Sequence, residues 1–284
     1  MKKYFLLLLT TVSIVSSCIQ RPTISKAQKD TNLVSYVDPF IGTGGHGHTY
    51  PGATMPYGMM QLSPDTRLDG WDGCSGYHYS DSEIYGFSHT HLSGTGVSDY
   101  GDILLMPTNT VIFNNGEDGA QGYKSRFSHD NEHASPGFYK VYLEDTNIEV
   151  ALTVSVRSGI HKYTFNEGSK QVVILDLEHR DEVLDSKLNI HSNTSISGYR
   201  HSKAWAEDQR LFFDMQFSRP YTKVTLLDDK KSGKKVKAAF EFDNTQSNIL
   251  EVIVGISPVD EQGAQQNWKE MRLLYKLHHE HHQC

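Results

Sequence analysis

Short apolar runs recur through the second half of the chain, and clusters of Gly, Asn, Asp or Lys separate many of them. The runs are rich in Val, Ile, Tyr, Phe and Thr, the residue types that favour strands. In residues 148–154 the apolar side chains mostly fall on one face of an extended segment. Seven or more such runs with no long helix between them predict a mainly β fold, an antiparallel β-sandwich. The predicted strands are residues 139–143, 148–156, 159–165, 172–176, 210–217, 236–242 and 249–256.

A single helix is predicted at the end of the chain, from Gln262 onward, where the turn signals stop. Apolar side chains there recur at helical spacing, which indicates one apolar face. That face either packs on the sandwich or leads into another domain. The residues at this spacing are Trp268, Met271, Leu274, Tyr275 and His278.

Residues 38–107 have a different character, with thirteen glycines and five histidines among several aromatic residues. Glycine is costly to order and histidine is rarely used for packing, so this composition is unusual for a core. It predicts long Gly-rich loops that present aromatic and imidazole side chains to a ligand. The alternative is an irregular β-region with no binding task.

The net charge of −7 and the scattered Lys and Arg residues leave no basic stripe for phosphates. We therefore expect no nucleic-acid partner.

The N-terminus is predicted to be a targeting segment. Lys2 and Lys3 precede an apolar run, residues 5–15, that is too short to span a membrane. The run ends in Val-Ser-Ser-Cys, which resembles a bacterial lipobox, so residues 1–17 are predicted to be a lipoprotein signal peptide and Cys18 the acylated residue. Residues 18–32 would then tether the domain to a membrane, which predicts a cell-envelope lipoprotein, periplasmic or in the outer membrane. An ordinary signal peptide is the alternative.

The Gly-rich region contains a literal G-x-G-x-x-G at residues 42–47, but no strand–helix context for a dinucleotide surrounds it. His46 and His48 lie two residues apart, as do His89 and His91, so each pair could hold a metal ion on an extended segment. The alternative is that these histidines bind hydroxyl groups or cap loops. Spacing gives no reason to choose a catalytic pair among the region's carboxylates.

Trp71, Asp72 and Tyr77 supply what a sugar site needs. An aromatic face packs on the C–H face of a pyranose, and carboxylate, imidazole and backbone groups hydrogen-bond its hydroxyls. The alternative is that Trp71 belongs to the core.

Several long blocks of the Gly-rich region resemble the N-terminal part of a glycoside hydrolase family 92 exo-α-mannosidase. A weaker resemblance continues through SPG (135–137), FSRP (217–220) and GIS (255–257) to about Gln266. The strongest blocks are VDPFIGTG (37–44), YPGA (50–53), PYGM (56–59), GYHYSD (76–81), GFSHTHLSGTG (86–96) and DYGDIL (99–104).

The resemblance implies a galactose-mutarotase-like β-sandwich followed by an (α/α)6 domain, with a sugar pocket between the two. It also implies a calcium-dependent, inverting enzyme that acts on mannose-containing glycans, with calcium ligands mainly in the helical domain and no cofactor held by this chain. No catalytic residue is expected here, because the acid and base belong to the helical domain. The residues expected to line the pocket are Gly44, Gly45, Trp71, Asp72, Tyr77, His89 and His91.

The resemblance places the sandwich at residues 33–261 and the start of an interdomain helix, with an aberrant tail, at 262–284. The expectation is a truncated chain that lacks the helical domain, by a premature stop, a frameshift or a split gene that puts it on a separate chain, and that has no turnover alone. A stand-alone carbohydrate-binding module is the second hypothesis, and a His-based metalloprotein is the third.

Overall fold

The computed structural model describes residues 33–281, with the side chains of the final helix as far as Arg272. The predicted signal peptide, the acylated Cys18, the tether and the terminal Cys284 lie outside the described residues. Within the described part, no helix is long and apolar enough to cross a membrane.

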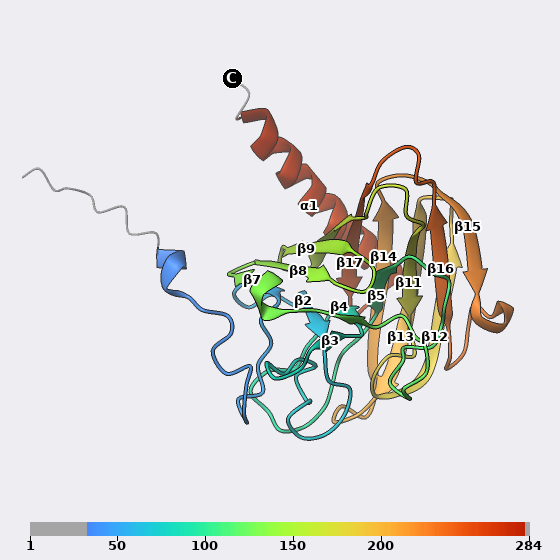
Figure 1. The fold of residues 1–284 in the computed structure, drawn as a ribbon. Coiled ribbons are helices and arrows are strands. Elements are labelled where there is room, and N and C mark those ends of the chain that lie inside the picture. The colour runs from blue at the N-terminus through green and yellow to red at the C-terminus, as the bar shows by residue number, and fades with distance from the viewer. Residues whose placement is uncertain (1–32, 282–284) are drawn as a thin grey trace, which may run out of the picture. The chain divides into compact units, whose positions relative to one another are not determined.

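Two antiparallel sheets form the domain (Figure 1). The first has seven strands, and four of them come from the Gly-rich region. In spatial order they are β1 (Ala53–Thr54), β2 (Gln61–Asp65), β4 (Gly86–Ser88), β5 (Leu104–Thr108), β11 (Gln171–Asp176), β16 (Lys237–Phe242) and β15 (Tyr221–Leu226).

The second sheet has eight strands and comes entirely from the chain after the Gly-rich region. In spatial order they are β12 (Glu182–Ile190), β13 (Ser195–Lys203), β14 (Gln209–Phe217), β17 (Ile249–Ser257), β10 (Ser158–Thr164), β9 (Ile148–Val154), β8 (Phe138–Leu143) and β7 (Glu132–Ser135). Smaller elements are the pair β3 (Glu83–Ile84) and β6 (Ser125–Arg126) and the 3-10 turns η1 (Leu33–Tyr36), η2 (His129–Asn131) and η3 (Leu227–Asp229).

The core lies between the two large sheets, as the hydrophobic pattern dictates. Along β9 every second residue is buried, which is the alternation expected of a strand with one face on the core. All six residues of β11 are buried, as befits an inner strand of its sheet. Phe217 of β14 meets Phe240 of β16 with ring centroids 5.3 Å apart, so the two sheets interlock through aromatic side chains.

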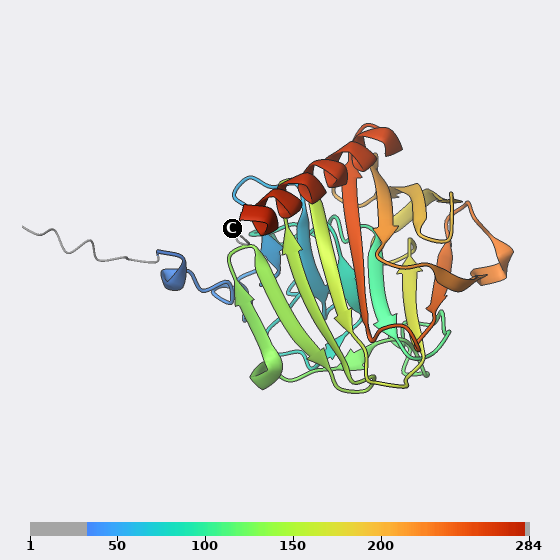
Figure 2. The ribbon, with the colours of Figure 1, turned by 90° about the horizontal axis from the view of Figure 1, so that it is seen from above.

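The last element, α1 (Glu261–His281), lies across the eight-stranded sheet (Figure 2) and contacts β10, β13, β14 and β17. Its buried Trp268 donates a hydrogen bond from Nε1 to Asp214 Oδ1 at 2.6 Å. A Cβ on Gly255 would lie 2.0 Å from the Ala264 carbonyl oxygen, so glycine at this point of β17 lets the helix approach the sheet.

The predicted antiparallel sandwich and C-terminal helix are confirmed, and each predicted strand is present within two residues of its expected bounds. Three long strands, β12, β13 and β15, were not predicted individually. The Gly-rich region is also more regular than its composition suggests, because it supplies half of a sheet as well as loops.

Candidate functional site

Trp71 and Asp72 lie together with the first histidine pair in a cluster of loops. His46 Nδ1 is 2.6 Å from Asp72 Oδ1, and the His48 ring meets the indole of Trp71 edge-on with centroids 4.5 Å apart. Trp71 remains 57% exposed, so it is not a core residue. The hydrogen bond from His46 lowers the pKa of Asp72, which keeps the carboxylate ionised as an acceptor. A partly exposed indole, which the His46 ring approaches with centroids 4.9 Å apart, and an ionised acceptor therefore lie side by side.

Glycines shape the backbone around this cluster. A Cβ on Gly96 would lie 2.0 Å from Trp71 Nε1, so the indole rests directly on the backbone of that loop. Gly45 has a φ of +59° and its carbonyl oxygen lies 3.0 Å from His78 Nε2, which ties the Gly44–Gly45 turn to the segment that carries Tyr77. The sequence-predicted turn, Trp71 and Asp72 thus belong to one connected set of loops.

Tyr77 lies beneath these loops and is almost fully buried. Its hydroxyl donates to Glu132 Oε2 at 3.0 Å, and Tyr139 donates to the other oxygen of the same carboxylate at 2.6 Å. Burial, together with the charge of Glu132, raises the pKa of Tyr77, so its hydroxyl remains a donor. His129 Nδ1 also meets Glu132 at 2.6 Å while its ring stacks on Tyr79 with centroids 4.1 Å apart. Tyr77 therefore lies in a network under the exposed cluster.

The second histidine pair is inside the sandwich. His89 is fully buried, with Nδ1 directed at the Ile103 carbonyl and Nε2 3.0 Å from His161 Nε2. His91 is 1% exposed and its Nδ1 lies 2.8 Å from the Gln61 carbonyl oxygen. The structure does not bring either histidine to the open face of Trp71.

A buried ionic group anchors the Trp71 loop from below. The Asp65 carboxylate is completely buried and faces His91 at 3.4 Å, His179 at 3.2 Å and Arg180 at 3.5 Å. Burial alone would raise the pKa of Asp65, but the charges of His91 and His179 outweigh it and hold that pKa well below its usual range.

Arg180 extends this anchor to the loop itself. Its Nη2 donates to the carbonyl oxygens of Gly73 at 3.1 Å and Cys74 at 3.2 Å, immediately after Asp72. Sequence reasoning missed Arg180 and Glu132, because no local motif marks either residue. The bonds of Arg180 to the loop span 106 and 107 residues, and the bond of Glu132 to Tyr77 spans 55.

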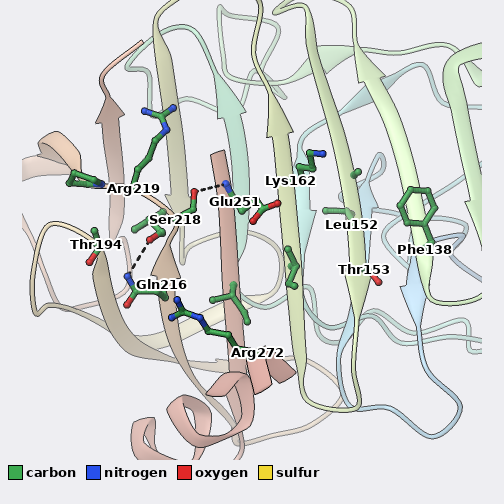
Figure 3. A pocket seen from close by; sticks show the side chains of 15 residues that line it. Phe138, Leu152, Thr153, Lys162, Thr194, Gln216, Ser218, Arg219, Glu251 and Arg272 are labelled. Carbon is green, nitrogen blue, oxygen red and sulfur yellow. Dashed lines mark hydrogen bonds between the residues drawn. The ribbon is translucent and has the colours of Figure 1, made fainter. Parts of the chain in front are cut away.

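Another hollow lies elsewhere, on the face of the eight-stranded sheet beside α1 (Figure 3). Its volume is about 570 Å³, and its wall is mostly apolar with Glu251 as the acidic side chain among the residues lining it. All four residues of the FSRP segment (217–220) line it, with Arg219 at one end. No sequence-predicted sugar residue is among its described lining residues, so its size alone does not make it the sugar site.

Among the described residues, no group of three or more His, Cys, Asp or Glu side chains is arranged to hold a metal ion. The histidines that suggested a metal contact carboxylates, aromatic rings, backbone groups or one another instead.

Comparisons with known proteins agree with this architecture. A family GH92 α-mannosidase of Bacteroides thetaiotaomicron, solved in complex with mannoimidazole, is 36% identical with a TM-score of 0.79, covering 84% of this chain and 34% of its own. The GH92 family glycosyl hydrolase ccman5 is 29% identical with a TM-score of 0.70, covering 82% of this chain and 33% of its own. An uncharacterized secreted glycosidase of Arthroderma benhamiae is 31% identical over 177 residues, which are 57% of this chain and 22% of that protein.

The chain therefore spans about a third of the length of these solved relatives. A family model described as the glycosyl hydrolase family 92 N-terminal domain matches residues 36–257. That match takes in both sheets and the loops around Trp71. The chain belongs to glycosyl hydrolase family 92.

Proposed function

We propose that this domain builds one wall of the mannose-binding pocket of an exo-α-mannosidase. The observation that carries the proposal is the exposed Trp71 beside the ionised Asp72 and His46, all held on Gly-rich loops. The GH92 α-mannosidase solved with mannoimidazole, at 36% identity, supports mannose as the sugar.

The cluster can hold a pyranose by two kinds of contact. The indole face of Trp71 would cover the apolar C–H face of the ring, which aromatic side chains do well because their surface is large and rigid. Asp72 would accept hydrogen bonds from sugar hydroxyls, and the exposed His46 would offer its free ring nitrogen. Gly44 and Gly45 would add backbone groups at the edge of the site.

We assign hydrolysis to the whole family protein and propose that these 284 residues alone have no turnover. An inverting glycosidase needs an acid and a base with carboxyl groups about 6.5–9.5 Å apart. We assign no step to calcium within this domain, because no group of three or more His, Cys, Asp or Glu side chains among its described residues is arranged to hold a metal ion. A glycan-binding activity without hydrolysis is the second function compatible with the same loops.

Titration calorimetry of the purified chain with methyl α-mannoside and an α-mannobiose tests the proposal. Trp71→Ala should weaken binding at least about tenfold, a loss of about 1.4 kcal/mol. Tyr57→Ala is the matched control, because its side chain is an aromatic ring that is fully exposed. Absence of sugar binding by the unaltered chain at saturating concentrations would refute the proposal, whereas binding accompanied by mannose release would refute the lack of turnover.

The proposed location is the cell envelope, with a lipid on Cys18. The relative from Arthroderma benhamiae is a secreted glycosidase, which supports export and leaves the anchor to be tested. Palmitate labelling in cells should be lost in Cys18→Ala, and labelling that persists would exclude this anchor.

A further inference from the structure

A second, smaller cavity of about 250 Å³ lies between β2, the start of β14 and the loop that precedes β5. Its floor includes the apolar side chains of Met59 and Leu211. Polar side chains from four separate segments converge on its wall, and none of them belongs to the Trp71 cluster. They are Gln61, Thr90, Tyr100, Asp102, Gln209 and Arg210.

Several of these polar side chains have hydrogen-bonding capacity left over. Gln209 donates from Nε2 to Asp102 Oδ2 at 2.7 Å, which leaves its amide oxygen as an acceptor. Gln61 Oε1 accepts from the His91 backbone N–H at 3.0 Å, which leaves its amide nitrogen as a donor. Within residues 33–281 the Tyr100 hydroxyl has no hydrogen-bond partner, and the side chain is only partly buried. Donors and acceptors therefore both face this space.

The wall is held rigid from behind. Asp102 is fully buried, pairs with Arg200 at its Oδ1 and accepts from Thr90 Oγ1 at 2.8 Å in addition to Gln209. These contacts use both carboxylate oxygens and fix the direction of the Gln209 amide. A preorganised wall lowers the ordering cost of binding.

His91 also contacts two residues of this wall. Its Nδ1 lies 2.8 Å from the Gln61 carbonyl oxygen, and its backbone pairs with Tyr100 in an isolated β-bridge. A buried histidine thus positions two residues that line the cavity.

The charge pattern favours a neutral ligand. Arg210 is the cation on the wall, and its Nε already donates to Asp208 Oδ1 at 3.1 Å. Asp102 is paired with Arg200 behind the wall, so an anion such as phosphate would find only the guanidinium of Arg210, whose charge Asp208 already offsets. Amide, phenol and guanidinium groups above an apolar floor match a sugar, which has hydroxyl groups and a C–H face.

We propose that this cavity is a second carbohydrate subsite, which binds one neutral hexose unit of a glycan through Gln61, Tyr100, Gln209 and Arg210. The identity of the sugar as mannose rests on the proposed function, whereas the position of the subsite rests on the cavity itself. His91 is a positioning residue for this subsite.

The test compares four proteins by saturation-transfer NMR and calorimetry with methyl α-mannoside. They are the unaltered chain, Trp71→Ala, the double variant Tyr100→Phe/Arg210→Ala, and all three substitutions together. The double variant keeps the Tyr100 ring and changes one exposed side chain, and an unaltered thermal midpoint confirms that it folds. A matched control, Tyr142→Phe/Arg126→Ala, makes the same chemical changes at residues that line neither site.

The expected result is residual binding in Trp71→Ala that falls at least tenfold when Tyr100→Phe and Arg210→Ala are added, with no effect of the control. Loss of all binding in Trp71→Ala, or unaltered binding in the double variant, would overturn the subsite and leave the proposed function standing. Loss in the double variant but not in Trp71→Ala would support the subsite and remove Trp71 from the function. No binding by the unaltered chain would overturn both.

Discussion

Two buried histidines make the stability of the sandwich sensitive to acid. Tyr163, His161, His89 and the Ile103 carbonyl form a chain of hydrogen bonds across the core. The directions are consistent when both histidines are neutral: Tyr163 donates to His161 Nδ1, His161 donates from Nε2 to His89 Nε2, and His89 donates from Nδ1 to Ile103. A proton on His89 would turn the contact between the two histidines into two donors facing each other, and a proton on His161 would remove the acceptor of the Tyr163 hydroxyl.

The size of the stability loss in acid follows from the pKa of His89. Burial, only partly offset by the hydrogen bond to Ile103, lowers that pKa from 6.5 to about 4. Between these values the unfolded chain binds a proton that the folded chain does not, so the free energy of unfolding decreases as the pH falls. The difference between the two pKa values lowers the free energy of unfolding by about 3 kcal/mol when the pH falls from 7 to 4. Burial also lowers the pKa of His161, which acts in the same direction.

Urea unfolding measured at several pH values from 7 to 4.5 tests this reasoning. His89→Asn keeps a donor for the Ile103 carbonyl but does not titrate, so its stability should depend less on pH, by about 2–3 kcal/mol over this range. His133→Asn is the control, because His133 is exposed and the substitution should leave the pH dependence unaltered. Parallel pH profiles for the unaltered chain and His89→Asn would refute the neutral hydrogen-bond chain.

Three further substitutions probe the packing of the loops and the helix. Gly76→Ala should lower the free energy of unfolding by at least about 2 kcal/mol, because φ is +85° and the new Cβ would lie 2.3 Å from Asp65 Oδ1. A smaller loss in urea unfolding would show that the loop relaxes around the new methyl group. Arg200→Met should cost about 3–5 kcal/mol, since it leaves the Asp102 carboxylate buried without its partner, and a thermal midpoint equal to that of the unaltered chain would contradict this. Trp268→Phe should lower the free energy of unfolding by about 1–3 kcal/mol, because it removes the indole donor from a buried carboxylate, and should speed proteolysis within α1. An unaltered cleavage rate would show that this hydrogen bond does not hold the helix on the sheet.

The sandwich could be predicted because its signals are local. Alternation along β9 and helical spacing around Trp268 each report which face of one element is buried. The strands β12 and β13 were missed because their burial comes from pairing with each other and with β14, and polar residues interrupt their apolar pattern. Sheet neighbours, rather than local sequence, define such strands.

The site could be predicted only in part, because its geometry depends on contacts between distant loops. Composition identified Trp71 and Asp72, but the contact of Asp72 with His46 spans 26 residues and follows from no local pattern. His89 and His91 have the same residue type and region as the exposed His46, yet the sandwich closes over them. Sequence alone does not distinguish a histidine that meets a ligand from one that satisfies a buried carbonyl.

The exposed chemistry of this domain depends on charges buried below it. Arg180 faces the ionised Asp65 and donates to the backbone carbonyls of Gly73 and Cys74, so the loop that ends in Asp72 is fastened to the core at its C-terminal side. The loop is therefore already ordered in the folded chain, so sugar binding does not carry the entropic cost of ordering it. Because the anchor carries an ion pair in a fully buried place, breaking it would leave an uncompensated charge, which makes loosening of the loop costly. The composition of this Gly-rich loop favours flexibility, but the buried anchor holds it in one conformation, in which the Trp71 indole is placed to contact a sugar ring.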